Sequence, residues 1–492
     1  KLVNDSPRDD AEHVLSQAHA YQIGSSRQEL AMQYQGYTPL LQRCPNLVVL
    51  STNGAGFDTI SLEDATAAGV AVVNQAGGNK EGVAEHVMAM MLALSKRIML
   101  TDHAMRSGAS YDRRDFMGDD VLGRTIGIIG GGQLGRYFVM SAHRLGYQVI
   151  VLDPDPASIA GAAADAQIVA AYDDAEALRD LASRCDAVTC EFENVPAASL
   201  ALLEQHLPVR PAASAVRVCQ DRREEKAFLT RAGVPVAPNL TLLPGEPLPA
   251  LPNDLFPAIL KTAREGYDGK GQWTIHQADE LPAALAASGV PCVLEKRLPL
   301  EGEFALTLAR SPSGAISALP LVQNWHSGGI LDQTRSPANV PALEREAQRI
   351  AEHIIAALDY VGVLTVEFFL VGGTLLVNEM APRPHNSGHP SLDNAECSQF
   401  ELQVRALCDL PLPEKAEVRP AILLNLLGDL WHGGTPDWEG VLALPGVHLH
   451  LYGKGEARPG RKMGHVTITG RDWPTVEDTS RHVRSLLGLP PR

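Results

Sequence analysis

A chain of 492 residues has room for about three domains of roughly 150 residues each. Its composition, with 45% hydrophobic and 20% charged residues, is typical of a globular protein and excludes a disordered or fibrous chain. The formal net charge of -16, without any basic tract of five or more residues, argues against a nucleic-acid surface, because duplex binding relies on lysine and arginine. Any anion site must therefore be built locally.

The remaining bulk features point to one compartment. No apolar run approaches the roughly 20 residues that cross a bilayer, and the N-terminus lacks the basic stretch and apolar core of a secretory signal. The seven cysteines are scattered singly and form no CxxC pair. We therefore expect a cytoplasmic protein that binds neither nucleic acid nor membranes.

Residues 1–123 alternate short apolar strands with helices. Strands are predicted at Leu47–Thr52 and Val70–Asn74, and a long helical pattern covers Val83–Met99. The polar, Asp-rich stretch Ser107–Asp120 that follows is typical of a linker.

After this stretch the chain restarts with a strand, a glycine turn, a helix and a second strand, a pattern that predicts a parallel sheet. Gly130, Gly132 and Gly135 satisfy G-x-G-x-x-G, and Asp153 closes the next strand. This pattern fits a dinucleotide such as NAD, since the glycines admit a pyrophosphate and the acid binds a ribose. Another phosphate-bearing ligand, or tight packing alone, fits the same residues.

A Pro-rich segment, Pro235–Pro257, marks a second domain boundary. Lys261 then closes an apolar strand, and a glycine loop at Gly266–Gly271 contains Lys270. Backbone amides of such a loop, beside a lysine, are typical of a nucleotide-triphosphate site, although the Walker A pattern is absent. A surface hairpin loop is the alternative.

Two glutamates follow a further apolar strand. Glu295 ends the strand and Glu303 lies eight positions later, since 303 − 295 = 8. Such acids are suited to accept hydrogen bonds from an adenine amine and a ribose hydroxyl. Solvated glutamates at a strand end fit equally well.

A pair of acids lies on a predicted hairpin. Glu367 and Glu379 occupy two apolar strands joined by a turn at Gly372 and Gly373. Across a short turn they face the same side of the sheet. Two buried carboxylates need a cation, and Mg²⁺ favours a few carboxylates together with phosphates. The alternative is a pair of salt-bridged acids.

The last cluster of chemical groups is basic, in a chain that is otherwise acidic. Lys454, Arg458, Arg461, Lys462 and His465 lie in one glycine-containing segment. They indicate an anion clamp for a substrate phosphate, or else a solvated basic loop.

Taken in order, these motifs resemble the ATP-grasp superfamily, and more narrowly the 5-(carboxyamino)imidazole ribonucleotide synthase family. The resemblance runs from about Arg124 to Gly470. It is carried by IGIIGGGQLGR (Ile126–Arg136), EFENVP (Glu191–Pro196), GYDGKGQW (Gly266–Trp273), NEMAPRPHNSGH (Asn378–His389) and YGKGEARPGRKMGHVT (Tyr452–Thr467).

The resemblance implies a ligase of purine biosynthesis that uses ATP, Mg²⁺ and bicarbonate to carboxylate 5-aminoimidazole ribonucleotide through carboxyphosphate. It also implies a homodimer. The ATP-binding residues would be Arg222, Lys261, Glu295, Lys296 and Glu303, and the metal ligands Glu367 and Glu379. The substrate-binding residues would be Gly132, Gln133, Leu134, Glu193, Asn386, Lys454, Arg461 and Lys462. Tyr267, Asp268, Lys270 and Arg383 would be catalytic, the first three in a loop that closes over a hydrolysable acyl phosphate.

The implied fold is α/β with three domains: a Rossmann-like substrate domain at 124–230, a two-lobed α+β ATP-grasp domain at 231–415, and a small β-rich domain at 416–492. Before them, Cys44–Ile98 resembles part of a D-2-hydroxyacid dehydrogenase, so residues 1–123 are expected to form a partial α/β segment of that kind.

That family takes its catalytic Arg, acid and His from chain that would follow the splice, and no matching segment is present there. Dehydrogenase activity is therefore expected to be absent. An NAD-dependent D-2-hydroxyacid oxidoreductase built on the N-terminal half is the alternative function, and a non-catalytic nucleotide-binding scaffold is a third hypothesis.

Overall fold

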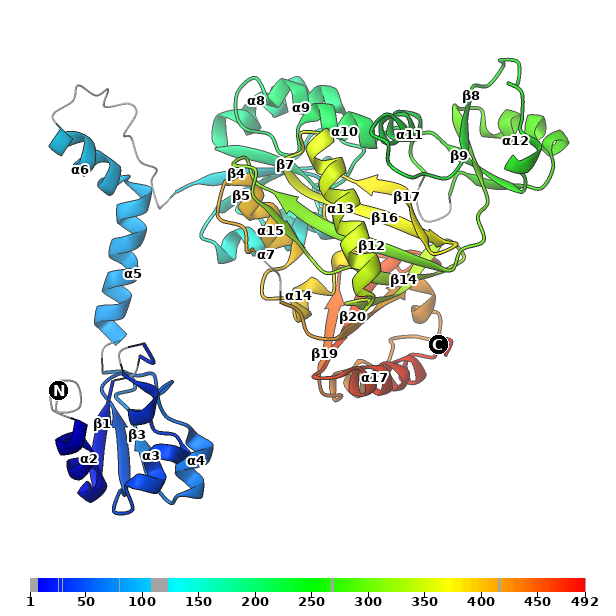
Figure 1. The fold of residues 1–492 in the computed structure, drawn as a ribbon. Coiled ribbons are helices and arrows are strands. Elements are labelled where there is room, and N and C mark those ends of the chain that lie inside the picture. The colour runs from blue at the N-terminus through cyan, green and yellow to red at the C-terminus, as the bar shows by residue number, and fades with distance from the viewer. Residues whose placement is uncertain are drawn as a thin grey trace. The chain divides into compact units, whose positions relative to one another are not determined.

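The computed structural model describes residues 8–24, 26–28, 30–78, 80–107, 123–266, 270–414 and 417–491. The chain forms two compact units, Lys1–Val121 and Leu122–Arg492 (Figure 1). The predicted linker lies outside the described residues, except for Ser107 at its start. Among the described residues, no helix combines the length and the apolar character that crossing a bilayer requires.

The first unit is a small α/β fragment around a parallel three-stranded sheet in the order β1-β2-β3. Leu40, Leu50 and Ala65 are buried at its centre. Both predicted strands are present and are shorter than expected. The elements are α2 (Arg8–Gln17), β1 (Ala20–Ile23), η1 (Met32–Tyr34), α3 (Thr38–Arg43), β2 (Val49–Thr52), α4 (Leu62–Ala67) and β3 (Ala71–Val73).

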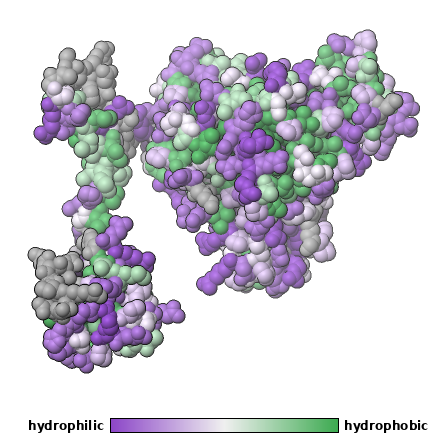
Figure 2. Space-filling model, viewed as in Figure 1, coloured by the Kyte–Doolittle hydropathy of each residue, from purple (hydrophilic) through white to green (hydrophobic). Residues whose placement is uncertain are grey.

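The helix predicted at Val83–Met99 is two helices, α5 (Lys80–Ser95) and α6 (Ile98–Ser107). Arg97 between them has a φ of 50°, which a continuous α-helix does not allow. None of the residues of α5 is buried, and Met88 and Leu94 are among its exposed apolar side chains (Figure 2).

The second unit begins with a four-stranded parallel sheet, in the order β6-β5-β4-β7. Its central strands are apolar at almost every position and are buried on both faces, as parallel strands covered by helices must be. The elements are β4 (Thr125–Ile129), α7 (Gln133–Arg144), β5 (Gln148–Leu152), η3 (Gly161–Ala163), β6 (Ala166–Ile168), α8 (Ala175–Arg184), β7 (Ala187–Cys190), α9 (Ala197–Leu203), α10 (Ala213–Cys219) and α11 (Arg222–Arg231).

An antiparallel four-stranded sheet follows, in the order β10-β9-β11-β8. Leu260 and Leu294 are fully buried in its core, so Lys261 and Glu295 extend from well-packed neighbouring strands. The elements are β8 (Asn239–Leu242), η4 (Asn253–Leu255), β9 (Ala258–Thr262), β10 (Gln272–Ile275), η5 (Ala278–Glu280), α12 (Leu281–Ser288) and β11 (Cys292–Lys296).

A nine-stranded sheet forms the centre of the unit, in the order β17-β16-β12-β14-β15-β18-β20-β19, with β13 paired to β12. Helix α13 packs on it through a buried stripe that includes Ile350 and Ile354. Its first part comprises β12 (Gly302–Arg310), β13 (Ile316–Ala318), β14 (Val322–Ser327), β15 (Ile330–Ser336), α13 (Pro341–Ala357), β16 (Gly362–Val371), β17 (Thr374–Ala381), η6 (Asn386–Gly388), α14 (Ser391–Asn394) and α15 (Gln399–Leu407).

The last strands extend this sheet and do not form a separate one, because β18 pairs with β15. They retain their own core, in which Leu424 and Val466 are fully buried beneath α17 and pack in one cluster with Val483 of that helix. The elements are β18 (Ala421–Leu427), η7 (Gly428–Trp431), α16 (Trp438–Leu442), β19 (Val447–Leu451), β20 (Lys462–Thr469) and α17 (Trp473–Leu486).

This core makes a prediction for stability. Leu424→Ala removes a fully buried side chain between β18 and α17 and should lower the free energy of unfolding by about 2–5 kcal/mol. The control Leu442→Ala, at a side chain that is 56% exposed, should change it by less than about 0.5 kcal/mol. Urea denaturation measures both, and equal effects would contradict the packing described here.

Candidate functional site

One large cleft, of about 1310 Å³, lies in the second unit. Its lining combines residues next to the parallel sheet with residues of the antiparallel sheet and of the nine-stranded sheet. The predicted site residues that line it are Gln133, Leu134, Glu193, Arg222, Lys261, Lys270, Glu295, Lys296, Glu303, Glu367, Glu379, Arg383, Asn386, Lys454, Arg461 and Lys462. Tyr267 and Asp268 lie outside the described residues, and Gly132 does not line the cleft.

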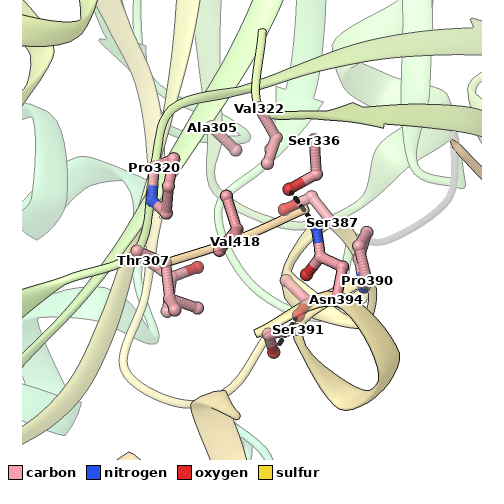
Figure 3. Close-up of a pocket in the computed structure, with 12 residues that line it drawn as sticks. Ala305, Thr307, Pro320, Val322, Ser336, Ser387, Pro390, Ser391, Asn394 and Val418 are labelled. Carbon is pink, nitrogen blue, oxygen red and sulfur yellow. Dashed lines mark hydrogen bonds between the residues drawn. The ribbon is translucent and has the colours of Figure 1, made fainter. Parts of the chain in front are cut away.

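A separate cavity beside η6 has a different character (Figure 3). It measures about 10 Å³, enough for roughly one water molecule. Asn394 donates a 3.1 Å hydrogen bond to Ser336 there, while its Oδ1 has no partner among the described residues. A buried water would satisfy that oxygen, and no substrate fits.

The two glutamates predicted to bind a metal ion are direct cross-strand neighbours. Glu367 on β16 pairs with Glu379 on β17, and a β-bulge follows Glu367. Gly372 and Gly373 have φ values of 56° and 73°, the left-handed geometry that tight hairpin turns require. The short turn therefore sets both carboxylates side by side.

Their surroundings make the two carboxylates unequal. Arg222 Nη1 lies 2.8 Å from Glu379 Oε2 and lowers the pKa of Glu379, although burial opposes this. Glu367 has no such arginine; burial, followed by the charge of Glu379, raises its pKa to about 7. His385 Nε2 is 3.2 Å from Glu367 Oε1, but burial and Arg383 lower the pKa of His385 to about 3, so the ring is neutral.

Lys261 belongs to a buried network behind the acids. Its Nζ lies 2.8 Å from Glu295 Oε2 and 3.4 Å from Asn378 Oδ1. Lys226 approaches Glu295 Oε1 at 3.5 Å, and both lysines help to lower the pKa of Glu295 although its burial opposes this. In this structure the Glu295 carboxylate forms ion pairs with Lys226 and Lys261, whereas the sequence suggested that it accepts a hydrogen bond from an adenine amine.

Other charged pairs line the rest of the cleft. Glu193 forms an ion pair with Arg383, which lowers the pKa of Glu193 despite its burial. Glu303 Oε2 lies 3.0 Å from His326 Nδ1 and raises the pKa of that ring, again against burial. Glu193, Arg383 and Glu303, all predicted site residues, thus line the same cleft.

The glycine turn is occupied by a side chain of the protein itself. Glu191, buried at the end of β7, accepts backbone hydrogen bonds from Gly132 and Leu134 at the N-terminus of α7. A Cβ at Gly132 would meet the Glu191 carboxylate at 2.3 Å, while the φ of −83° at Gly132 suits any residue. The glycine is thus required for the close approach of Glu191.

This arrangement removes the dinucleotide interpretation. Asp153, expected to bind a ribose, is 7% exposed and accepts hydrogen bonds from Gly131 at 2.7 Å and Tyr172 at 2.6 Å. The backbone amides that would bind the pyrophosphate of NAD donate to Glu191, and the acid that would bind its ribose accepts hydrogen bonds from the protein. Among the predicted substrate contacts, Gln133 and Leu134 line the cleft. Gly132 does not line it, and its N–H donates a hydrogen bond to Glu191 instead.

The basic hairpin, which is the segment 454–462 between β19 and the start of β20, lines the cleft. Lys454 Nζ donates a 2.7 Å hydrogen bond to the Lys462 carbonyl, and Arg461 Nη1 donates to the Glu456 carbonyl at 2.9 Å. His465, grouped with these cations from the sequence, is fully buried instead. A β-bulge in β20 next to Lys462 breaks the regular alternation of side chains, so the sequence pattern alone does not give the side of the strand on which His465 lies.

Sequence reasoning missed Lys226, Asn378, His385 and His326, all in or next to the cleft. Asn378 and His385 had a recognisable local signal, since both lie in the NEMAPRPHNSGH motif. The others are ordinary helix or strand residues whose position depends on packing between distant segments.

The glycine turn makes a prediction. Gly132→Ala should lower the free energy of unfolding by about 1–3 kcal/mol, because the new methyl group displaces the Glu191 carboxylate. Gly433→Ala is the matched control, since a Cβ there meets nothing within 4 Å. Thermal unfolding with and without NAD measures both effects; stabilisation of the unmodified chain by NAD would contradict the internal role of the turn.

Comparison with known families gives three adjoining matches. Residues 123–220 match the ribonucleotide synthetase preATP-grasp domain, residues 227–400 the ATP-grasp domain, and residues 421–479 the phosphoribosylaminoimidazole carboxylase C-terminal domain. The matches start at residue 123, close to where the resemblance found in the sequence also starts, and residues 1–122 lie before them.

Curated relatives are similar over the same region. The N5-carboxyaminoimidazole ribonucleotide synthase of Pseudomonas aeruginosa is 41% identical over 364 residues, covering 74% of this chain and 99% of the relative. The enzyme of that name from Bacillus subtilis is 42% identical over 351 residues, covering 70% and 91%.

Solved structures agree. The N5-carboxyaminoimidazole ribonucleotide synthetase of Thermus thermophilus superposes with a TM-score of 0.67 at 39% identity, covering 75% of this chain and 99% of that one. The Aspergillus clavatus enzyme, solved with ADP and 5-aminoimidazole ribonucleotide, gives 0.67 at 32% identity, covering 75% and 100%. The fold, the cleft and these similarities together establish that this chain belongs to the N5-carboxyaminoimidazole ribonucleotide synthase family of ATP-grasp ligases.

Proposed function

We propose that this chain uses ATP and bicarbonate to carboxylate the amine of 5-aminoimidazole ribonucleotide, a step of purine biosynthesis. The observation that carries the proposal is one cleft that joins the paired acids, the buried lysines and the basic hairpin in a member of this family. In the reaction a bicarbonate oxygen attacks the γ-phosphorus of ATP, releasing ADP and forming carboxyphosphate. The substrate amine then takes the carboxyl group, losing a proton, and phosphate leaves.

Residues around the antiparallel sheet are suited to bind ATP. Lys261 and Arg222 supply positive charge at the cleft wall, and the proposed contacts of Glu295, Lys296 and Glu303 lie along the same wall. Phosphoryl transfer depends mainly on positioning and charge neutralisation, so residues that hold phosphate oxygens matter more than covalent chemistry. Glu295 acts here by orienting Lys261.

Glu367 and Glu379 are proposed to hold Mg²⁺. The donor set fits, because two carboxylates lie side by side, and the arginine beside them pairs with Glu379 and leaves Glu367 for a cation. A bound Mg²⁺ would neutralise charge on the phosphate oxygens. When the metal is bound, Arg222 is expected to share Glu379 with it or turn toward a phosphate.

The imidazole ribonucleotide is proposed to lie between the parallel sheet and the basic hairpin. Lys454, Arg461 and Lys462 would bind its phosphate, and Gln133, Leu134, Glu193 and Asn386 would line its remainder. Arg383, oriented by Glu193, would hold the anionic carboxyl donor. The loop with Tyr267, Asp268 and Lys270 would exclude water from carboxyphosphate.

Two finer inferences concern the whole chain. The parallel β1-β2-β3 sheet supports a partial dehydrogenase-like origin for residues 1–123, without dehydrogenase activity since no catalytic segment follows. The resemblance to the family also supports a homodimer.

ADP release with MgATP, bicarbonate and 5-aminoimidazole ribonucleotide, each omitted in turn, tests the proposal. Release should require the ribonucleotide, and Glu367→Ala should reduce kcat by at least about 100-fold because charge compensation at the phosphates is lost. Glu414→Ala, at an exposed acid outside the cleft, should retain full activity. Absence of release, with NADH oxidation on 2-oxo acids instead, would refute the ligase.

The raised pKa of Glu367 gives a pH prediction for the metal-free protein. Between about pH 4.5 and 7 the folded state keeps a proton that the unfolded state has lost, so stability falls as pH rises. Glu367→Gln removes this effect and should be more stable than the original chain above pH 7, by up to about 3 kcal/mol, with little gain near pH 4.5.

The neighbouring acid is the matched control. Glu379→Gln deprives Arg222 of its ion pair and should destabilise the chain at neutral pH. Urea denaturation in chelator at pH 5 and pH 8 distinguishes them. Equal changes in stability for both variants would contradict the difference in pKa between Glu367 and Glu379.

A further inference from the structure

A second group of metal-ligating side chains is made of residues that do not line the cleft. His450 on β19 and His465 on β20 are direct cross-strand partners, and their rings stack at 4.4 Å with an interplanar angle of 13°. Asp393, on α14, faces the same pair. Two strands and a helix from distant parts of the sequence thus bring two imidazoles and a carboxylate together.

The distances suit a single ion. His450 Nε2 lies 2.9 Å and 3.1 Å from the two carboxylate oxygens of Asp393. One ligand atom from each of Asp393, His450 and His465 lies within 4.8 Å of the other two. His448, two positions before His450 on the same face of β19, places Nδ1 3.7 Å from Asp393 and borders the group.

His465 supplies the independent observation. Its side chain is fully buried, and Nε2 has no hydrogen-bond partner among the described residues. Nδ1 lies 2.8 Å from the Tyr452 hydroxyl. A histidine that binds a metal through one nitrogen usually donates its other N–H to a fixed partner, and Tyr452 is placed to accept it. This tautomer leaves the lone pair of Nε2 available to a ligand.

The surroundings are aromatic. Tyr137 lies edge-on to His450 with ring centroids 5.8 Å apart, and Tyr452 and Phe400 complete a buried cluster with Tyr137. His389 lies beside His465 with ring centroids 5.0 Å apart, and its Nδ1 forms a hydrogen bond with Gln399 Nε2. An unpartnered imidazole nitrogen in such a setting is costly unless something binds it.

We propose that Asp393, His450 and His465 bind one transition-metal ion of the Zn²⁺ class. Two imidazoles and one carboxylate are ligands that Zn²⁺ favours, whereas Mg²⁺ takes oxygen ligands. Three protein ligands leave a position for water or His448. The ion would tie the β19–β20 hairpin to α14; Lys454 and Arg461 lie in the connection of this hairpin, and Lys462 begins β20. The site is thus structural and separate from Glu367 and Glu379.

Co²⁺ binding to the full chain, after removal of metals with a chelator, tests the site. Carried out with excess Mg²⁺ present, the titration should give the intense visible absorption of a tetrahedral ion at one equivalent per chain. Zn²⁺ should displace it, with a Kd below about 1 μM. Absence of this absorption, or a Kd far above that value, would overturn the proposal.

Variants locate the ion. His450→Gln and Asp393→Asn should each abolish stoichiometric binding, and Tyr452→Phe should weaken it by about 10- to 100-fold through loss of the partner of His465. His482→Gln, at an exposed histidine on α17, and Glu367→Gln should bind as the original chain does. Circular dichroism shows which variants fold. Undiminished binding in folded His450→Gln, or its loss in Glu367→Gln, would overturn the assignment.

Discussion

Two carboxylates that cannot separate dominate the electrostatics of this protein. Glu367 and Glu379 are fixed opposite each other by a two-glycine hairpin, inside a cleft wall where unpaired negative charge is costly. Their proximity explains why Arg222 lies on one of them and why Glu367 keeps its proton to an unusually high pH. Two carboxylates held this close are favoured in their charged form by a cation between them, and this is the physical basis of the metal site proposed above.

The nine-stranded sheet carries this electrostatic centre across the unit. Strands β12, β14, β15 and β18 lie between β16, with Glu367, and β20, with Lys462. Glu367 and Lys462 nevertheless line one cleft. One continuous sheet therefore contributes the basic side chain of Lys462 and the paired carboxylates to a common space.

The glycine turn shows how a local motif can serve a different purpose. A helix N-terminus with free amides attracts an anion, and in dinucleotide-binding proteins the anion is a pyrophosphate. Here Glu191 provides it from β7, and Asp153 fastens the turn from β5. The turn becomes a rigid support that presents Gln133 and Leu134 to the cleft. Local sequence cannot distinguish the two uses, because the deciding carboxylate is about sixty residues away.

The sequence by itself determined the α/β class, the parallel sheet after Arg124, the hairpin of Glu367 and Glu379, and the family, because these depend on local periodicity, turn glycines and contiguous motifs. Only the tertiary structure decided which groups meet. It placed Lys226 on Glu295, Glu191 in the glycine turn, and His465 with His450 inside the fold. Each of these contacts joins segments far apart in the chain or depends on which face of a strand is buried, and burial is a property of the packed whole.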